Sequence, residues 1–291
     1  MGLATAHKAA PVRRDGRTVR LLREALVWLP ALLLVVWTAT PILWAFTASL
    51  KQPLEIYEST SLLPRSPSLD AYRQVVQMRG FPRWFLNSVV ITAVATVVPL
   101  VLSVVAAYAF ARYAFRLRHV LLLLFLIPRI LPRVALIVPL YDLLFELGLL
   151  NTYAGLFLTY IASAVPLATW LLVGFIAGVP RELEESAAID GASLWIRLRY
   201  VVIPMIWPGI VTAAVLCVRE AWNEFPFVLA FTNTTEMRTL PYQLYVLEDA
   251  MGIQDWAVYN AFTIMTILPL LVLYLLLERR IVSNIVGGAL K

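Results

Sequence analysis

Five ionisable side chains lie inside long apolar segments of the sequence, where charge is energetically costly. Arg129 and Arg133 stand four residues apart in one segment, and Arg219, Glu220 and Glu224 cluster in another. If such segments cross a bilayer, an unpaired charge at its middle costs about 2.5 to 3.5 kcal/mol on insertion scales. We therefore expect all five side chains to face protein or water.

These charges permit two kinds of chemistry. Arg129 and Arg133 share one face of a helix by their spacing, so they can pair with Glu220 or Glu224 as interhelical ion pairs. Alternatively, the arginines line a cavity and bind a hydroxyl, or an anionic group such as phosphate or carboxylate, in bidentate fashion. The sequence leaves both interpretations open.

A second chemical feature is the polar stretch of residues 181–193, which separates two apolar segments. Pro180 and the acidic first turn after it favour a helix that begins at once. Gly191 permits a turn, and Pro204 is expected to end a second short helix. The pattern predicts two short helices across one face of a membrane, with small residues that let another protein approach closely.

The composition requires lipid as the solvent of these elements. The chain of 291 residues is 61% hydrophobic and 14% charged, with a mean hydropathy of +0.80. Since a helical span takes about 20 apolar residues, the sequence predicts an all-α polytopic membrane protein with six transmembrane helices. The expected spans are residues 25–48, 85–111, 119–144, 153–178, 206–231 and 258–278.

The positive charges indicate how these spans are oriented. The formal net charge is +6, and many of the basic residues precede the first span or lie between spans two and three. Residues 145–152 and 232–257 contain Arg238 as their only basic residue. The positive-inside rule then places both termini and the loop 179–205 in the cytoplasm. This distribution is typical of membrane orientation and argues against nucleic acid as a partner.

The expected organisation follows from these spans. Its parts are a basic cytoplasmic tail at 1–24, a six-span domain at 25–278 with an external loop at 49–84, and a cytoplasmic tail at 279–291. Within the external loop, Leu69 to Met78 allow a short amphipathic helix. Three prolines predict that the third span is bent or locally unwound.

The polar loop carries the most specific motif of the chain. Its matching residues are Glu185, Ser186, Ala187, Gly191, Val201, Ile203 and Pro204. In type and spacing they resemble the EAA loop of ABC importer permeases. Weaker stretches in the same order support this, among them Asn87-Ser88, residues 106–112 from Ala106 to Arg112, and residues 147–152. The chain looks most similar to the smaller permease of maltose-type carbohydrate importers, in the binding-protein-dependent transport system family.

This resemblance implies a place in a heteromeric complex of a bacterial or archaeal cytoplasmic membrane. The implied partners are a sister permease subunit, two ATPase subunits, an extracytoplasmic solute-binding protein and a sugar or sugar-like solute. The loop would dock into the ATPase, with Glu185 as an electrostatic anchor and Gly191 shaping the turn. The implied coupling residues are Glu184, Glu185, Ser186, Ala187, Asp190, Gly191, Ala192 and Pro204.

The sequence does not predict an enzyme. It contains no phosphate loop of the form G-x-x-x-x-G-K-S/T, so we expect ATP and Mg²⁺ to be bound by the partner ATPase and no cofactor to be bound by this chain. His7 and His119 lie far apart, and no metal-ligand spacing emerges. No catalytic residue is predicted.

The resemblance also suggests that some polar and aromatic residues inside the spans contact the solute. Aromatic faces stack on sugars and amides bond hydroxyls, although such residues more often serve packing. The candidate pathway residues are Arg129, Arg133, Tyr160, Trp222, Asn223 and Glu224. The competing function is a secondary transporter that uses its buried charged residues for ion coupling, which predicts inverted repeats. No convincing repeat relates the two halves of the chain.

Overall fold

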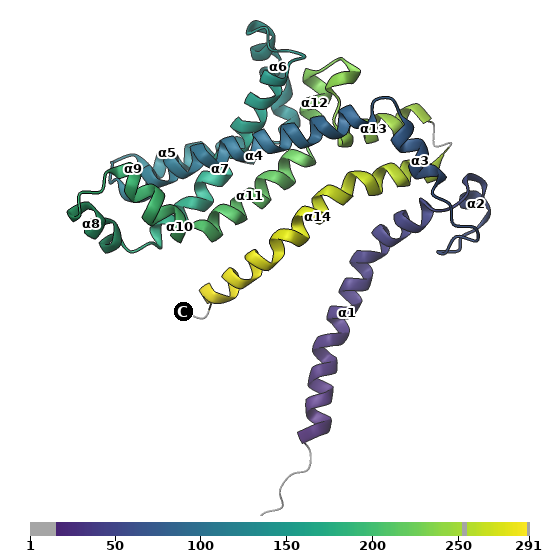
Figure 1. Cartoon of the computed structure of the whole chain (residues 1–291), viewed down its shortest axis with the longest axis horizontal. Helices are drawn as coiled ribbons and strands as arrows, with labels where there is room; N and C mark the ends of the chain where they lie inside the picture. Colours follow the sequence, from purple (N-terminus) through teal and green to yellow (C-terminus); the bar gives the residue numbers. More distant parts are fainter. Residues whose placement is uncertain (1–15, 252–254, 290–291) are drawn as a thin grey trace, which may run out of the picture.

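The computed structural model describes residues 16–251 and 255–289, and within these ranges it contains helices and no strand. Figure 1 shows their arrangement. The long helices are α1 (Gly16–Ala48), α4 (Phe81–Arg112), α7 (Tyr153–Ala177), α11 (Trp207–Trp222) and α14 (Trp256–Ala289). The shorter ones are α2 (Pro53–Glu58), α3 (Asp70–Gln77), α5 (Arg118–Ile130), η1 (Arg133–Leu136), α6 (Ile137–Glu146), α8 (Arg181–Ile189), α9 (Leu194–Arg197), η2 (Leu198–Val202), α10 (Ile203–Met205), α12 (Pro226–Phe231), η3 (Thr235–Met237) and α13 (Leu240–Met251).

The described helices confirm the all-α polytopic fold. Four of them are long and apolar enough to cross a membrane, and two bent helix pairs bring the number to six. The continuous spans are α4, α7, α14 and the apolar part of α1, Leu26–Ala48. The bent spans are α5 with η1 and α6, and α9 to α10 with α11.

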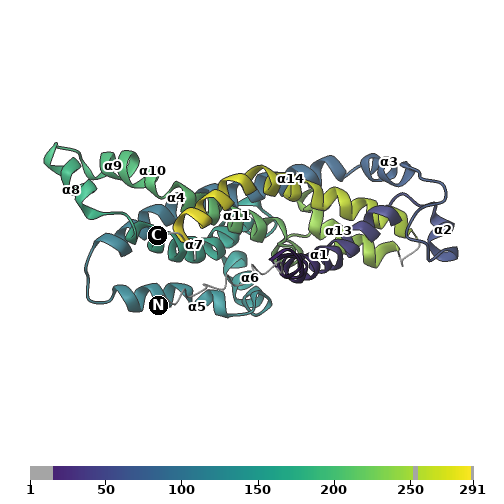
Figure 2. The same cartoon turned by 90° about the horizontal axis from the view of Figure 1, so that it is seen from below.

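The core of the bundle is formed by α4, α7 and α11 (Figures 1 and 2). Small side chains such as Ala107, Ala168 and Ala213 are almost completely buried where these helices meet. Small residues let helix backbones approach closely, which is how helices associate in lipid. By contrast, α1 diverges from the bundle, and none of its apolar window is buried within the chain.

The third span breaks as its prolines predict. Helix α5 ends at Ile130, and the chain resumes as η1 at Arg133, with a bend of 99° between the two arms. Pro132 lies inside this break and has no backbone N–H to give to a preceding carbonyl. Pro128 and Pro139 are accommodated within α5 and α6.

The fifth span ends earlier than predicted, so the expected range of 206–231 is wrong at its C-terminal end. Helix α11 stops at Trp222, and residues 223–225 lead into the separate helix α12. Pro226 explains the stop, because its ring would clash with the carbonyl of residue 222 in a continuous helix. At its N-terminal end, α11 meets the short helices before it at an angle of 77°.

The two loops outside the spans lie at opposite ends of the molecule. Helices α8, α9 and α10 of the loop 179–205 lie at one end, and α2 and α3 of the loop 49–84 lie at the other (Figures 1 and 2). The short amphipathic helix expected near Leu69 to Met78 is present as α3. Its buried residues Ala71 and Val75 pack in the same cluster as Phe262 of α14.

The terminal tails differ from their expected extents. Helix α1 begins at Gly16, inside the region expected as a tail, and residues 1–15 lie outside the described residues. Helix α14 continues to Ala289, so nearly all of the expected tail at 279–291 extends the last span as helix. Residues 290–291 are not described.

Asn87 and Ser88, which had supported the family resemblance, attach a distant loop to α4. The Asn87 amide donates to the carbonyl oxygens of Glu236 and Arg238 at 2.6 and 2.8 Å, and the Leu240 amide donates to the Ser88 hydroxyl at 2.8 Å. Asn87, Ser88 and Leu240 are themselves buried. The pair thus fixes the segment before α13 against the core.

Two glycines of α7 provide a matched test of this packing. A Cβ at Gly155 would collide with the backbone carbonyl of Leu149, whereas a Cβ at Gly174 would meet nothing within 4 Å. We expect Gly155→Ala to destabilise the protein by about 1 to 3 kcal/mol. Gly174→Ala should be neutral or stabilising by up to about 1 kcal/mol. Thermal unfolding in detergent, followed by circular dichroism, measures both; equal unfolding temperatures for the two variants would contradict the packing at Gly155.

Candidate functional site

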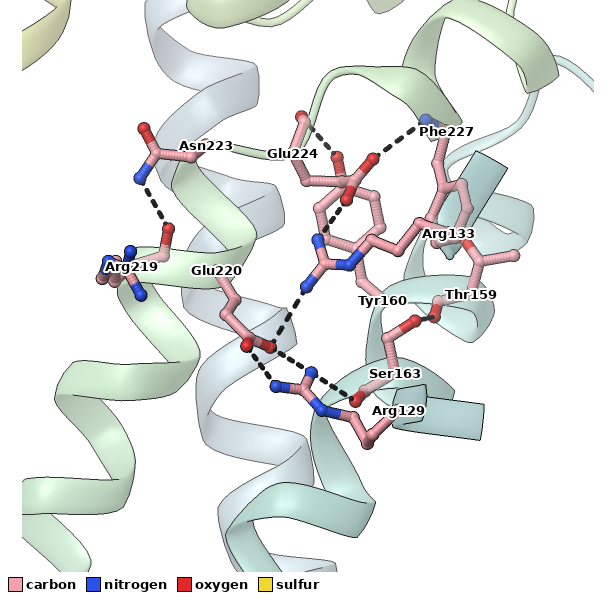
Figure 3. Close-up of polar contacts among 10 residues, drawn as sticks. All are labelled: Arg129, Arg133, Thr159, Tyr160, Ser163, Arg219, Glu220, Asn223, Glu224 and Phe227. Atoms are coloured by element: carbon pink, nitrogen blue, oxygen red, sulfur yellow. Dashed lines mark hydrogen bonds and ion pairs between the residues drawn. The ribbon is translucent and has the colours of Figure 1, made fainter. Parts of the chain in front are cut away.

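Four charged side chains form one connected network, namely Arg129, Arg133, Glu220 and Glu224 (Figure 3). Both terminal nitrogens of Arg129 donate to the Glu220 carboxylate, at 2.6 Å for the Nη1 contact. Arg133 bridges the two acids, with one nitrogen on Glu224 and another 3.3 Å from Glu220. Ser163 adds its carbonyl oxygen as an acceptor for Arg129 at 3.5 Å. Interhelical ion pairing, one of the two interpretations of the sequence, is therefore present.

The network joins the two breaks in the transmembrane helices. Arg129 lies in the last turn of α5, and Arg133 begins η1 beyond the break. The expectation that they share a helical face is wrong, because the chain is not helical at Leu131 and Pro132. They meet nonetheless, since the bend turns both side chains toward α11 (Figure 3). Their partners lie at the end of α11 and directly after it.

Glu224 accepts two hydrogen bonds in addition to its ion pair. Its Oε1 accepts a hydrogen bond from the Phe227 amide at 3.0 Å, which caps the first turn of α12. Its backbone carbonyl accepts from the Tyr160 hydroxyl at 3.0 Å. The residue is only 4% exposed, so these bonds replace the water that it gives up on folding. Glu224 is consequently a structural part of the break.

A cavity of about 360 Å³ opens beside the network. It lies between the broken span and α7. Its polar wall consists of Arg129, Arg133, Thr159 and Ser163. The two arginine charges are matched by Glu220 and Glu224, so the cavity offers hydrogen-bonding groups without an excess of charge.

The structure separates the remaining candidate pathway residues into two groups. Trp222 is 6% exposed and donates its indole N–H to the Thr266 carbonyl at 3.1 Å, and Tyr160 is 4% exposed. Because both rings are buried, neither has a free face on which a sugar could stack. Solute binding by Trp222 or Tyr160 stays a prediction. Asn223 is exposed, on the side of α11 opposite Glu220 (Figure 3).

A second buried charge pair fixes the loop 179–205 to the bundle. Arg112, in the last turn of α4, donates to Glu184 at 2.7 Å and to the Val179 carbonyl at 2.9 Å. The Tyr108 hydroxyl donates to the other Glu184 oxygen at 2.7 Å. The side chains of Arg112 and Glu184 are 9% and 6% exposed. Sequence reasoning missed this anchor, because it used residues 106–112 only as support for the family resemblance and assigned Glu184 to ATPase coupling.

The opposite side of the same loop is free of the bundle. Glu185, Ser186 and Asp190 are exposed, and Ala187 and Ala192 are partly covered. Gly191 has a φ of +83°, so it occupies the left-handed conformation that the turn between α8 and α9 requires. The turn that the sequence predicts at Gly191 is present.

Pro204 differs from its expected place. It does not end the second short helix but lies inside α10, directly after the π-helical segment η2, and the helix continues to Met205. Because proline donates no N–H, it is tolerated in the first turn after such a change of helix type. The sharp turn follows at Ile206.

With this geometry established, comparison with known proteins identifies the family. Residues 99–282 match the family described as the binding-protein-dependent transport system inner membrane component. The chain belongs to this family. The matched region includes both the charge network and the loop 179–205, so the permease carries its two candidate sites within the family's common part.

Several relatives match this permease over most of its length. The sulfoquinovosyl glycerol transport system permease SmoH of Agrobacterium fabrum is 34% identical over 271 residues, covering 92% of this chain and 94% of the relative. The trehalose transport system permease SugB of Mycobacterium tuberculosis is also 34% identical, covering 92% and 98%. The trehalose/maltose permease MalG of Thermococcus litoralis is 30% identical, covering 93% and 98%. The relatives are sugar ABC transporter permeases, which gives no support to the alternative of a secondary transporter.

A solved structure agrees with the fold. A chain of a bacterial ABC transporter involved in the import of the acidic polysaccharide alginate superimposes with a TM-score of 0.75 at 21% identity. The match covers 93% of this permease and 99% of that chain. At this identity the likeness establishes the arrangement of helices.

Removing the charge of Glu184 tests the anchor of the loop. Loss of one partner from a buried ion pair costs about 3 to 5 kcal/mol, because the other charge stays uncompensated. We expect Glu184→Gln to accelerate hydrogen exchange of the backbone amides in α8. Glu185→Gln, which removes an exposed charge one position later, serves as the control and should leave exchange unchanged. Equal exchange in both variants would show that Glu184 does not hold the loop.

The charge network can be tested by a double-mutant cycle. Arg133→Gln and Glu224→Gln should show a coupling free energy of about 1 to 3 kcal/mol, since the two groups are in direct contact. The exposed pair of Arg73 and Asp70, 3.2 Å apart with side chains 73% and 61% exposed, provides the control and should couple by about 0 to 1 kcal/mol. Unfolding by SDS titration measures both cycles. Similar values for the two pairs would contradict a structural role of the network.

Proposed function

We propose that this permease forms half of the pathway for a sugar or sugar-like solute in a binding-protein-dependent ABC importer. A sister permease subunit supplies the other half. Two ATPase subunits dock on the loops at one end, and an extracytoplasmic solute-binding protein delivers the solute at the other. Family membership and the sugar permeases among the relatives support this proposal.

The observation that carries the proposal is the exposed apolar surface of the loop 179–205. Ile189 is 87% exposed, Trp195 62% and Tyr200 69%, although all three lie on short helices beyond the core of the bundle. Exposed apolar groups gathered in one place, with acidic residues such as Glu185 beside them, are typical of a protein interface. An ATPase subunit is the partner that the family supplies for this surface.

The loop is connected to the spans in a way that suits force transmission. Through Glu184 and Arg112, helix α8 is attached to α4, and α10 leads through Ile206 directly into α11. Closure of the ATPases would move the loop as a rigid body and carry α4 and α11 with it. Because α11 ends at the charge network, the motion reaches the broken third span.

In this proposal the permease is not an enzyme. ATP and Mg²⁺ are bound by the partner ATPases, since this sequence has no phosphate loop, and no cofactor belongs to the chain itself. The family name, inner membrane component, supports this division of labour.

The proposed orientation places the loop 179–205 and both termini in the cytoplasm. The positive charge before the first span and between spans two and three supports it. So does the position of the loop 49–84 at the opposite end of the bundle, where an external binding protein could reach it (Figure 1). A related fold is known in complex with an alginate pentasaccharide-bound periplasmic protein, with a TM-score of 0.65.

Gly191 provides a sharp test of coupling. A valine at a φ of +83° is strained by about 1 to 3 kcal/mol, so Gly191→Val should distort the turn that presents the loop to the ATPase. We expect ATP hydrolysis without matching solute uptake in proteoliposomes, with substrate recognition intact. Gly148→Val introduces similar strain at a φ of +65° between α6 and α7 and is the matched control. Full uptake in the Gly191 variant would count heavily against the proposed coupling.

A further inference from the structure

Of the five charged residues Arg129, Arg133, Arg219, Glu220 and Glu224, only Arg219 lies outside the network. Its neighbour Glu220 points toward Arg129 and Arg133, whereas Arg219 lies on another face of α11 and away from the network (Figure 3). The side chain is exposed, and no partner for its guanidinium is found among the side chains that the structure describes. The network of two arginines and two glutamates is neutral, so Arg219 contributes an uncompensated positive charge.

At its depth in the bilayer, Arg219 is too far from the lipid headgroups for them to neutralise its charge. It lies twelve residues after Trp207, which places it about 18 Å along α11 at a rise of 1.5 Å per residue. With Trp207 at the edge of a hydrocarbon core about 30 Å thick, this position is near the middle of the core. A charge at that depth faces protein or water.

The surroundings of Arg219 form a groove rather than a flat surface. A cavity of about 270 Å³ separates α11 from α14; its wall is apolar and includes the aliphatic part of the Arg219 side chain. Residues from both helices line it, including Val215, Val218, Leu270, Leu271 and Tyr274. Inside low-dielectric walls the attraction between a cation and an anion is stronger than in water.

Asn223 extends this polar face by one helical turn. It lies four residues after Arg219, is exposed, and its amide donates to the Arg219 carbonyl oxygen at 2.8 Å. The amide oxygen is thereby turned outward as an acceptor, and the guanidinium fork lies below it (Figure 3). A guanidinium binds carboxylates and similar anions by two parallel hydrogen bonds, and an amide bonds hydroxyls.

We propose that Arg219 and Asn223 form a subsite for an anionic sugar on the pathway face of the permease. Arg219 takes the carboxylate or other acidic group, and Asn223 takes a neighbouring hydroxyl. The proposal rests on the function proposed above, because it requires this side of α11 to face the pathway. It moves the candidate anion-binding group from Arg129 and Arg133, whose charges are already matched, to Arg219.

The test uses the whole transporter, purified with its sister permease and ATPases in lipid nanodiscs. Equilibrium binding of radiolabelled digalacturonate is compared with that of maltose, a neutral disaccharide. We expect the wild-type complex to bind the acidic probe about tenfold to a hundredfold more tightly, the range for hydrogen bonds to charged groups. Arg219→Gln should abolish this preference, and Asn223→Ala should weaken both probes alike.

Two further variants keep the test decisive. Arg116→Gln removes an exposed positive charge from the link between α4 and α5 and should leave the preference unchanged. Arg219→Lys retains the charge without the guanidinium fork, so it should assemble and bind the acidic probe more weakly than the wild type. Equal affinities for the two probes in the wild-type complex, including no binding of either, would overturn the subsite.

Other outcomes separate this inference from the proposed function. If the complex assembles and hydrolyses ATP but shows no preference, the subsite fails and the importer function stands. If no ATPase assembles with the permease, the proposed function itself fails. Failure of Arg219→Gln to assemble, with no acid preference in the wild type, would mean that Arg219 pairs with a carboxylate of the sister subunit.

Discussion

Hydrocarbon offers no partner to a charge, and this constraint governs the centre of the molecule. Arg129 and Arg133 are tolerated there because they form ion pairs with Glu220 and Glu224. The same bonds hold together two places where the backbone leaves the helix, after α5 and after α11. Broken helices inside a membrane are stable only where the freed groups are buried in protein or face a water-filled cavity. The ion pairs therefore stabilise the two helix breaks, and the breaks bring the charged side chains close enough to pair.

A similar arrangement stabilises the loop 179–205 at the end of the bundle. Glu184 accepts hydrogen bonds from Tyr108 and Arg112, and Arg112 also donates to the carbonyl of Val179. With one side of α8 fixed in this way, the residues that resemble a docking motif are left on the exposed side. Rigid attachment and an accessible surface are the two properties that a mechanical contact requires.

Much of the fold was predictable because bilayer thickness and backbone hydrogen bonding leave few alternatives. The six spans, the bend at the prolines of the third span, the helix near Leu69 to Met78 and the turn at Gly191 all follow from local residue types. The ends of elements were less predictable. The fifth span stops at Trp222 and the last helix continues to Ala289, since both depend on what the flanking residues contact.

The sequence alone indicated a polytopic membrane protein with a polar loop that resembles the EAA type, because hydropathy and motif spacing are local properties. Tertiary structure decided which charges are matched. No spacing rule reveals that Arg112 reaches Glu184, or that the arginines on either side of a helix break converge on Glu220. The adjacent residues Arg219 and Glu220 lie on different faces of α11: Glu220 joins the charge network, and Arg219 points away from it (Figure 3). Such partnerships depend on how distant helices pack, and packing is settled only by the folded chain.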